Sequence, residues 1–316
     1  MFRQLSVPTP FQVGPVNAYL AGRTLVDPGP DSDEAWSTLL EHLESQNLAP
    51  EDIEQVLVTH PHPDHFGLAK RFSDLGARIV ASEEATTIVE AFESHLEFEQ
   101  SYFLDFFERC GMARTTAQTV TNLPDAFLAY APSVDVEESV TDHDSVVVND
   151  TALDVSTVTG HAAGEVIFAF DTDGQRRALV GDNVLPDITP NPFLLPAAAP
   201  DEPRPRVLPA YNDSLDALQE RPFDRFLPGH REVIENPADR ISEIRQAHED
   251  RTANVADIVD GPMTPVEVME ALFGDLPATE MFSGMSEAVG HLDVLEARGQ
   301  VRCREDGGLL VYEPTQ

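Results

Sequence analysis

Residues 59–67 read THPHPDHFG, a stretch rich in groups that bind metal ions. Imidazole and carboxylate side chains are good ligands for zinc and similar divalent ions. Two intervening prolines stop a helix from running through the stretch, so an irregular loop can point alternate residues to different places. We therefore expect parts of two metal sites here, with the ligands divided in pairs: His60 and His62, then Asp64 and His65.

Three later positions could complete these ligand sets. Zinc takes about four ligands, so two residues per ion are too few. His161, Asp182 and His230 each follow a short apolar run typical of a strand, and both histidines come directly after a glycine, which allows close approach of the backbone. A histidine at a strand end is more often structural or solvated. Three such positions together with an incomplete cluster favour ligands instead.

These motifs resemble those of the metallo-β-lactamase fold superfamily, including its glyoxalase II-like members. The HxHxDH stretch and the later His, Asp and His occur in that family's order, and the opening VNAYLAGRTLVDPG is similar to the family's first strands. The resemblance spans about residues 11–235. It implies an α/β fold built as a four-layer αββα sandwich, and a metal-dependent hydrolase.

The resemblance also implies a dinuclear centre with two zinc ions, for which iron or manganese are alternatives. The first ion would be held by His60, His62 and His161. The second would be held by Asp64, His65 and His230, with Asp182 bridging both. Two such ions lower the pKa of a shared water and make hydroxide available for attack. Asp64 could act in catalysis by steering protons, and Asp27 and Thr59 would fix the histidine tautomers from behind.

Alternating strands and helices must position these residues. The hydrophobic pattern predicts strands and helices in the order β-β-α-β-α-β, which indicates helices layered on a sheet, over the ranges 11–30, 31–46, 54–60, 65–76 and 77–82. A helical stretch rich in aromatic residues follows to about residue 121, and we expect its rings to pack in a core. Further strands are predicted at 144–150, 151–160, 165–173, 176–182 and 224–230, with a helix at about 212–220.

The C-terminal part has a different pattern. Three helices are expected, a long one at 236–259 and two shorter ones capped by Thr264 and by Ser283 or Ser286, and then a hairpin. Helix-helix-helix-hairpin is the order of a small winged-helix domain. We therefore divide the chain into a metallohydrolase domain, 1–235, and a helical, winged-helix-like domain, 236–316.

The composition limits the partners. Asp and Glu total 56 against 20 Lys and Arg, a formal net charge of -36, and Lys70 is the single lysine. Such a surface is typical of adaptation to a salt-rich cytoplasm, and it argues against a nucleic-acid partner without excluding one. No apolar run approaches a membrane span of about 20 residues, and no signal peptide is visible, so we expect a cytoplasmic protein with a small-molecule substrate. The two cysteines, far apart in the sequence, predict no disulfide framework.

The substrate stays open between several readings, because a fold does not fix a function. A glyoxalase II-like esterase or thioesterase is the first. A ribonuclease or phosphodiesterase is the second, because the winged-helix tail resembles the LACTB2-like group and because Arg298, Arg302 and Arg304 surround the expected wing. Lactonase activity uses the same metal set, whereas a true β-lactamase generally uses a different one. A non-enzymatic reading also remains, in which the metal centre is a sensor and the tail serves regulation or homodimerisation.

Four residues are candidates for substrate contacts, although each also has a purely structural interpretation. Asn191 lies in the proline-rich stretch 185–209, which follows Asp182, and Tyr211 lies just after it. His248 and Arg251 lie about one turn apart on the long helix after His230, so they share a face.

Overall fold

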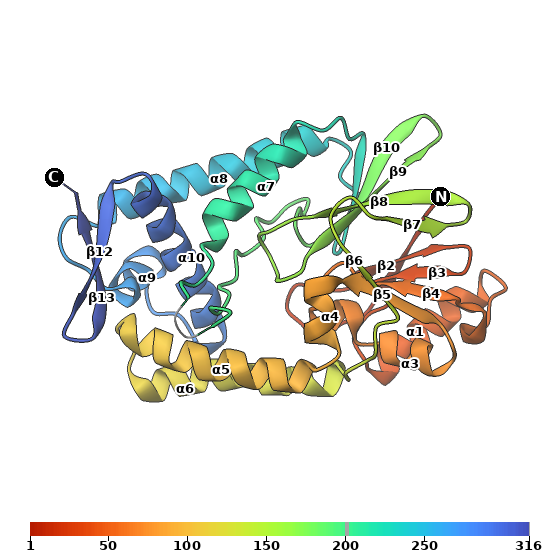
Figure 1. The fold of residues 1–316 in the computed structure, drawn as a ribbon, viewed down its shortest axis with the longest axis horizontal. Helices are drawn as coiled ribbons and strands as arrows, with labels where there is room; N and C mark the ends of the chain where they lie inside the picture. The colour runs from red at the N-terminus through yellow and green to blue at the C-terminus, as the bar shows by residue number, and fades with distance from the viewer. Residues whose placement is uncertain (200–201, 316) are drawn as a thin grey trace. The chain divides into compact units, whose positions relative to one another are not determined.

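A computed structural model describes residues 1–199 and 202–315 (Figure 1). Residues 200 and 201 of the proline-rich stretch lie outside the described residues. The chain packs as two compact units, each assembled from separate stretches. Unit 1 comprises Met1–Ser94, Ala126–Pro190 and Leu218–Ile241, and unit 2 comprises the described parts of His95–Asp125, Asn191–Ala217 and Ser242–Gln316.

Unit 1 contains two sheets. The larger sheet has six strands in sequence order: β1 (Arg3–Val7), β2 (Val16–Ala21), β3 (Thr24–Val26), β4 (Gln55–Leu57), β5 (Arg78–Ser82) and β6 (Glu138–Val140). The first three are antiparallel, and β3 to β6 run parallel to one another. The second sheet has the order β11 (Arg225–Pro228), β10 (Gln175–Gly181), β9 (Val166–Thr172), β8 (Thr151–Thr157) and β7 (Ser145–Val148), with one parallel pair, β10 and β11.

Alternation along the strands creates two cores in unit 1. Val56 faces a cluster shared with the helices of this unit, and its neighbour Leu57 faces a second cluster between the sheets, together with Val155 and Phe168. The helices are α1 (Asp33–Glu44), α2 (Pro63–Phe66), α3 (Ala69–Asp74) and α4 (Glu83–Val89). The first five residues of β9 are all buried, so both faces of the second sheet are covered at this strand, whereas β7 and β8 alternate buried with exposed residues. The expected α/β sandwich is confirmed.

The prediction of a single helix over residues 65–76 in unit 1 is wrong in detail. The range 65–76 was expected to be one helix, but the structure divides it into α2 and α3 at Gly67 and Leu68. A Cβ on Gly67 would lie 2.0 Å from the backbone oxygen of Tyr130. This close approach between distant parts of the chain exists only in the folded protein, so local periodicity does not reveal it.

Most of unit 2 is helical. Its elements are α5 (Phe92–Arg109), α6 (Arg114–Asn122), α7 (Val207–Gln219), α8 (Pro237–Ile258), α9 (Pro265–Phe273), α10 (Ala278–Ala297) and the hairpin of β12 (Val301–Asp306) and β13 (Leu309–Pro314), although α5, α7 and α8 each extend into unit 1. Phe103, Phe106 and Phe107 pack with Met285 and Leu292 in one core, as the aromatic stretch predicts. Phe98 is the exception, because it is 46% exposed.

The C-terminal elements follow the predicted order of three helices and a hairpin, and their description as a winged helix stays a prediction. Thr264 caps α9 in a capping box with Glu267, as expected. The expected cap at Ser283 or Ser286 is wrong, because α10 begins at Ala278 and both serines lie inside it. The hydroxyl of Ser286 donates to the Phe282 carbonyl one turn earlier, which satisfies it without ending the helix.

The boundary at residue 235 also stays a prediction. The packing groups two earlier stretches, His95–Asp125 and Asn191–Ala217, with the C-terminal helices. The aromatic side chains of α5 contribute to the unit 2 core, which explains why contacts place this helix there. Among the described residues, none of the helices is both long enough and apolar enough to span a bilayer.

Candidate metal centre

The candidate ligands follow strands that end at the same edge of unit 1. In the larger sheet, β3 and β4 are parallel, and Val26 pairs with Leu57 immediately before Asp27 and the loop that leads to His60. In the second sheet, Gly181 pairs with Pro228; Asp182 directly follows Gly181, and His230 comes two residues after Pro228. The amide of Val166 donates to the Thr59 carbonyl and joins the two sheets there. Parallel strands therefore bring residues far apart in the sequence to one place.

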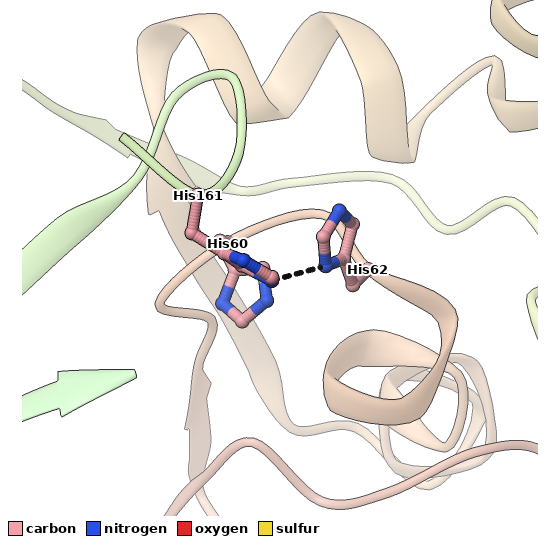
Figure 2. A group of neighbouring side chains, drawn as sticks. All are labelled: His60, His62 and His161. Atoms are coloured by element: carbon pink, nitrogen blue, oxygen red, sulfur yellow. Dashed lines mark hydrogen bonds between the residues drawn. The ribbon is translucent and has the colours of Figure 1, made fainter. Parts of the chain in front are cut away.

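Three histidines form the first group, His60, His62 and His161 (Figure 2). Their candidate ligand atoms lie within 4.8 Å of one another. The ring nitrogens His62 Nδ1 and His161 Nε2 are 3.0 Å apart, with one hydrogen bond between them. His62 and His161 lie 99 residues apart in the sequence, and the fold alone brings them together.

A second group consists of Asp64, His65 and His230, with the same close spacing. His230 Nε2 lies 3.3 Å from the carboxylate oxygen Oδ2 of Asp64, and His65 Nε2 lies 4.0 Å from the same atom. Both histidines are completely buried, and Asp64 is nearly so.

Asp182 lies between the two groups. Its Oδ1 is 3.6 Å from His65 Nε2, and its Oδ2 is 3.7 Å from His161 Nε2 and 3.4 Å from His230 Nε2. One carboxylate therefore faces the second group with both oxygens and the first group with one. This is the position that a bridging ligand needs.

The tautomers of three histidines follow from their partners, because carbonyl and carboxylate oxygens only accept hydrogen bonds. His230 Nδ1 donates to the Pro15 carbonyl at 2.8 Å, and His65 Nδ1 donates to Asp27 Oδ2 at 3.0 Å. The Thr59 hydroxyl donates to Asp27 Oδ2 at 2.7 Å, so it can accept from His60 Nδ1 at 3.0 Å. In each ring, Nε2 is left with a lone pair for a cation. Asp27 and Thr59 therefore contact His65 and His60 from the side away from Nε2.

Unpartnered polar atoms test whether a cation fits here. Within the described part of the chain, His60 Nε2, His65 Nε2, His230 Nε2 and Asp182 Oδ1 are buried and have no hydrogen-bond partner. Leaving such atoms unpaired costs free energy, on the order of 1–3 kcal/mol each. All four belong to the groups around Asp182, so a divalent ion with nitrogen and oxygen ligands would satisfy them together.

The pKa shifts divide the candidate histidine ligands into two kinds, those with a lowered pKa and those with a raised pKa. Burial and the neighbouring His161 lower the pKa of His62 to about 3, so its ring is uncharged at neutral pH. Burial also acts to lower the pKa of His230, but Asp182 and Asp64 outweigh it and raise this pKa to about 9. The nearby histidines keep the pKa of Asp182 well below its usual value despite burial. A cation would therefore take the place of a proton on the His230 side.

Two glycines allow the backbone to pack close to the candidate ligands. A Cβ on Gly181, which has a φ of +48°, would lie 2.7 Å from the Thr59 hydroxyl oxygen. A Cβ on Gly229 would lie 2.3 Å from Asp182 Oδ1 and 2.6 Å from His65 Cε1. The backbone thus approaches the ligands closely, as the glycine before His230 suggests in the sequence.

Two residues escape sequence reasoning. Glu165 is completely buried at the start of β9, and its Oε2 accepts from the amide of His161 and from the side chain of Asn183. Burial raises the pKa of Glu165 to about 8. The available signal was positional, because a Glu precedes the apolar run VIFAF and an Asn follows Asp182 directly.

The family comparison agrees with this geometry. A family model described as the metallo-beta-lactamase superfamily matches residues 12–230, which include every residue of both groups and Asp182. The chain belongs to the metallo-β-lactamase superfamily. In this family context, the two groups and Asp182 can hold divalent metal ions, as the sequence motifs indicate.

Relatives match almost the whole chain. The "Probable metallo-hydrolase YqjP" of Bacillus subtilis (strain 168) is 30% identical over 313 residues, covering 98% of this chain and 96% of that protein. The metallo-beta-lactamase family protein TTHA1429 from Thermus thermophilus superimposes with a TM-score of 0.81 and 27% identity, covering 99% of this chain and 98% of that one. A beta-lactamase domain protein from Burkholderia ambifaria has the same TM-score at 24% identity, covers 99% and 91%, and shows the fold alone. The chain is thus a metal-dependent hydrolase of this superfamily.

The candidate substrate residues belong to unit 2, whereas the metal groups belong to unit 1. Tyr211 is completely buried against the His248 ring, and Asn191 donates to the Ser283 carbonyl at 3.2 Å. Arg251 pairs with Glu287 at 2.7 Å. These contacts give each side chain a structural task inside unit 2, and their role in substrate binding stays a prediction.

Proposed function

We propose that this protein is a dinuclear metallohydrolase that cleaves a small ester or thioester. The position of Asp182 supports the proposal, because its two oxygens lie 3.4 to 3.7 Å from histidines of both groups. His60, His62 and His161 would hold one ion, and the second group would hold the other. When bound, such a pair acidifies water and polarises the substrate's carbonyl oxygen.

The chain's own residues prepare that chemistry. Asp27 and the Pro15 carbonyl hold His65 and His230 by Nδ1, so that their Nε2 atoms face the centre. Although burial acts to raise the pKa of Asp64, His65 and His230 lower it, so this carboxylate is ionised at neutral pH. Ionised Asp64 can accept a hydrogen bond from a water molecule or take up a proton from it.

Charge pairing in unit 2 favours a small substrate over a polyanion. Each of the three arginines around the C-terminal hairpin has a carboxylate partner. Arg298 donates to Glu249 at 2.9 Å, Arg302 to Glu313 at 2.9 Å, and Arg304 to Asp306 at 2.7 Å. With a net charge of -36, the protein offers a polyanion little net attraction there. Ribonuclease activity therefore has less support than ester or thioester hydrolysis.

Metal content and a substrate panel test the proposal. We expect about two metal equivalents per chain by mass spectrometry, with zinc as the first candidate. The panel, assayed with and without molar KCl, contains an S-lactoyl thioester, a lactone, bis-p-nitrophenyl phosphate and a short RNA. Thioester or ester turnover that His62→Ala abolishes would support the proposal. RNA cleavage without thioester turnover would replace it with the nuclease reading, and well under one metal equivalent would contradict the dinuclear centre.

A further inference from the structure

Packing alone does not explain why Glu165 is buried where it is. It lies at the start of β9, and none of its surface is exposed. A carboxyl group is costly to bury, so a buried one is expected to be held by hydrogen bonds. An apolar side chain would fill the same space at lower cost. The contacts of Glu165 must therefore explain its burial.

Those contacts join two parts of the metal centre. Glu165 Oε2 accepts a hydrogen bond of 2.9 Å from Asn183 Nδ2 and a longer one of 3.4 Å from the backbone amide of His161. His161 belongs to the first histidine group, and Asn183 directly follows Asp182. One carboxyl oxygen thus links the loop after β8 to the turn after β10.

Both linked segments are irregular and need such support. The loop from 158 to 165 lies between β8 and β9, and the amide of Val158 donates to the Glu165 carbonyl at its base. On its other side, the Ser82 hydroxyl donates to the Gly164 carbonyl at 2.6 Å. The turn after β10 is closed by the amide of Asn183, which donates to the Val180 carbonyl. Glu165 connects these two segments through the hydrogen bonds that its Oε2 accepts.

We propose that Glu165 and Asn183 form a clasp that sets the distance between His161 and Asp182, which makes Glu165 a positioning residue for the metal centre. The clasp keeps His161 Nε2 and Asp182 Oδ2 3.7 Å apart, close enough for both to reach one ion. Residues of this kind, which orient ligands without touching the metal, typically change metal affinity by about 10–100-fold when removed. The inference rests on the proposed function, because it assumes a metal at this place.

Four variants test the clasp: Glu165→Ala removes it, Glu165→Gln keeps an acceptor oxygen, Asn183→Ala removes its second half, and a double variant combines Glu165→Ala with Asn183→Ala. The metal dissociation constant is measured by competition with a chromogenic chelator, and the thermal midpoint Tm is measured on metal-free protein. We expect Glu165→Ala to weaken metal binding by about 10–100-fold and Glu165→Gln by less than about threefold. The double variant should bind no more weakly than Glu165→Ala, because both changes break one link.

Glu137→Ala is the matched control. Glu137 also accepts a backbone amide, that of Ile79 at 2.7 Å, but Ile79 lies near the amino end of β5 and not at the edge that carries the ligands. The metal dissociation constant of Glu137→Ala should equal that of the wild type. The clasp is overturned if Glu165→Ala binds metal like the wild type, or if it lowers the metal-free Tm while leaving the dissociation constant unchanged. A wild-type protein that binds no metal would overturn the proposed function itself, and the clasp with it.

Discussion

Each unit of the protein buries a cluster of histidines and acids, but the two clusters differ in how their polar atoms are used. In unit 1, His65 and His230 are fully buried, and their Nε2 atoms face Asp182 without a hydrogen bond to any described residue. In unit 2, His248 and His291 are equally buried, but most of their ring nitrogens have a hydrogen-bond partner. Burial of histidine alone therefore does not define a metal site.

Of the four ring nitrogens of His248 and His291 in unit 2, three have a hydrogen-bond partner, and His248 Nε2 has none among the described residues. His248 Nδ1 and Asn212 Oδ1 are 2.7 Å apart, and His291 contacts Thr252 and Glu287 through its two ring nitrogens. Among the described residues, the groups with metal-ligand spacing all lie in unit 1: the two described above and a third that overlaps them, Asp27, His60 and His65. The informative signal is the convergence of several unpartnered atoms on one point: within the described parts of the chain, four lie around Asp182, whereas the contacts of His248 and His291 leave one, His248 Nε2.

The largest predicted effect concerns the residue at that point. Asp182→Asn removes the charge between the two groups, so we expect loss of bound metal and a fall in kcat/KM of roughly a thousandfold, about 4 kcal/mol. Metal analysis and kinetics on the preferred substrate measure both.

A buried aspartate of unit 2 provides the control for this variant. Asp293 pairs with Arg204 at 2.7 Å. Asp293→Asn should lower Tm, because it leaves a buried guanidinium without its counter-charge, but it should not change the metal content. Full metal content in Asp182→Asn would contradict the view that the cluster around Asp182, unlike the cluster of unit 2, is a metal site that depends on this carboxylate.

A second prediction uses the acid sensitivity of unit 2. Burial lowers the pKa of His248 to about 4, whereas an unfolded histidine titrates near 6.5. As the pH falls from 6.5 towards 4, the unfolded chain gains a proton that the folded one resists, so stability declines by up to about 3 kcal/mol. His248→Asn should remove this part of the decline.

Thermal unfolding between pH 7 and pH 4.5 measures the effect as a difference in Tm between variant and wild type. His143→Asn is the control, because the His143 side chain is 90% exposed and Asn tolerates its positive φ of 73°. Identical pH profiles for wild type and His248→Asn would show that His248 is not a source of acid sensitivity.

A third prediction concerns the partners behind the ligands of unit 1. Asp27 receives hydrogen bonds from His65 and from Thr59, whose hydroxyl contacts His60, so Asp27→Asn should leave both histidine rings poorly oriented and weaken metal binding by about 10–100-fold. Asp31→Asn is matched to it, because Asp31 accepts a bond from Arg71 and contacts no candidate ligand in the described contacts. Equal metal dissociation constants for the two variants would contradict the orienting role.

The smallest effect is expected at the surface of unit 2. Arg302 and Arg304 share partners such as Glu313, and exposed pairs of this kind contribute about 0–1 kcal/mol. The double change to Gln should leave Tm nearly unchanged and should not alter RNA affinity in a fluorescence anisotropy titration. A clear loss of RNA binding would instead identify the hairpin as a nucleic-acid contact.

The sequence predicts the ligands better than their surroundings, and the reason is physical. Metal binding requires rare residue types at strand ends, so His60, Asp182 and His230 are recognisable one by one. Strands such as β4, β5 and β10 also follow local hydrophobic patterns. By contrast, β1 and β6 lie at the two edges of their sheet and were not predicted, because short edge strands have little apolar patterning.

The clasp shows the same limit within the site. A glutamate before an apolar strand is usually solvated, so nothing local predicts that Glu165 is buried. Its burial results from the packing of β9 between its neighbours β8 and β10, and its contacts depend on a turn that follows another strand. Properties that depend on such distant partners become visible only in the folded chain.

The crowding around Gly181 and Gly229 has a consequence for mutational screens. A side chain at either position would collide with Thr59 or Asp182, although neither glycine carries a functional group. In saturation mutagenesis selected on activity, both positions should therefore be as intolerant as the ligands themselves. Only a separate measurement of folding and metal content would distinguish residues that perform the chemistry from those that leave room for it.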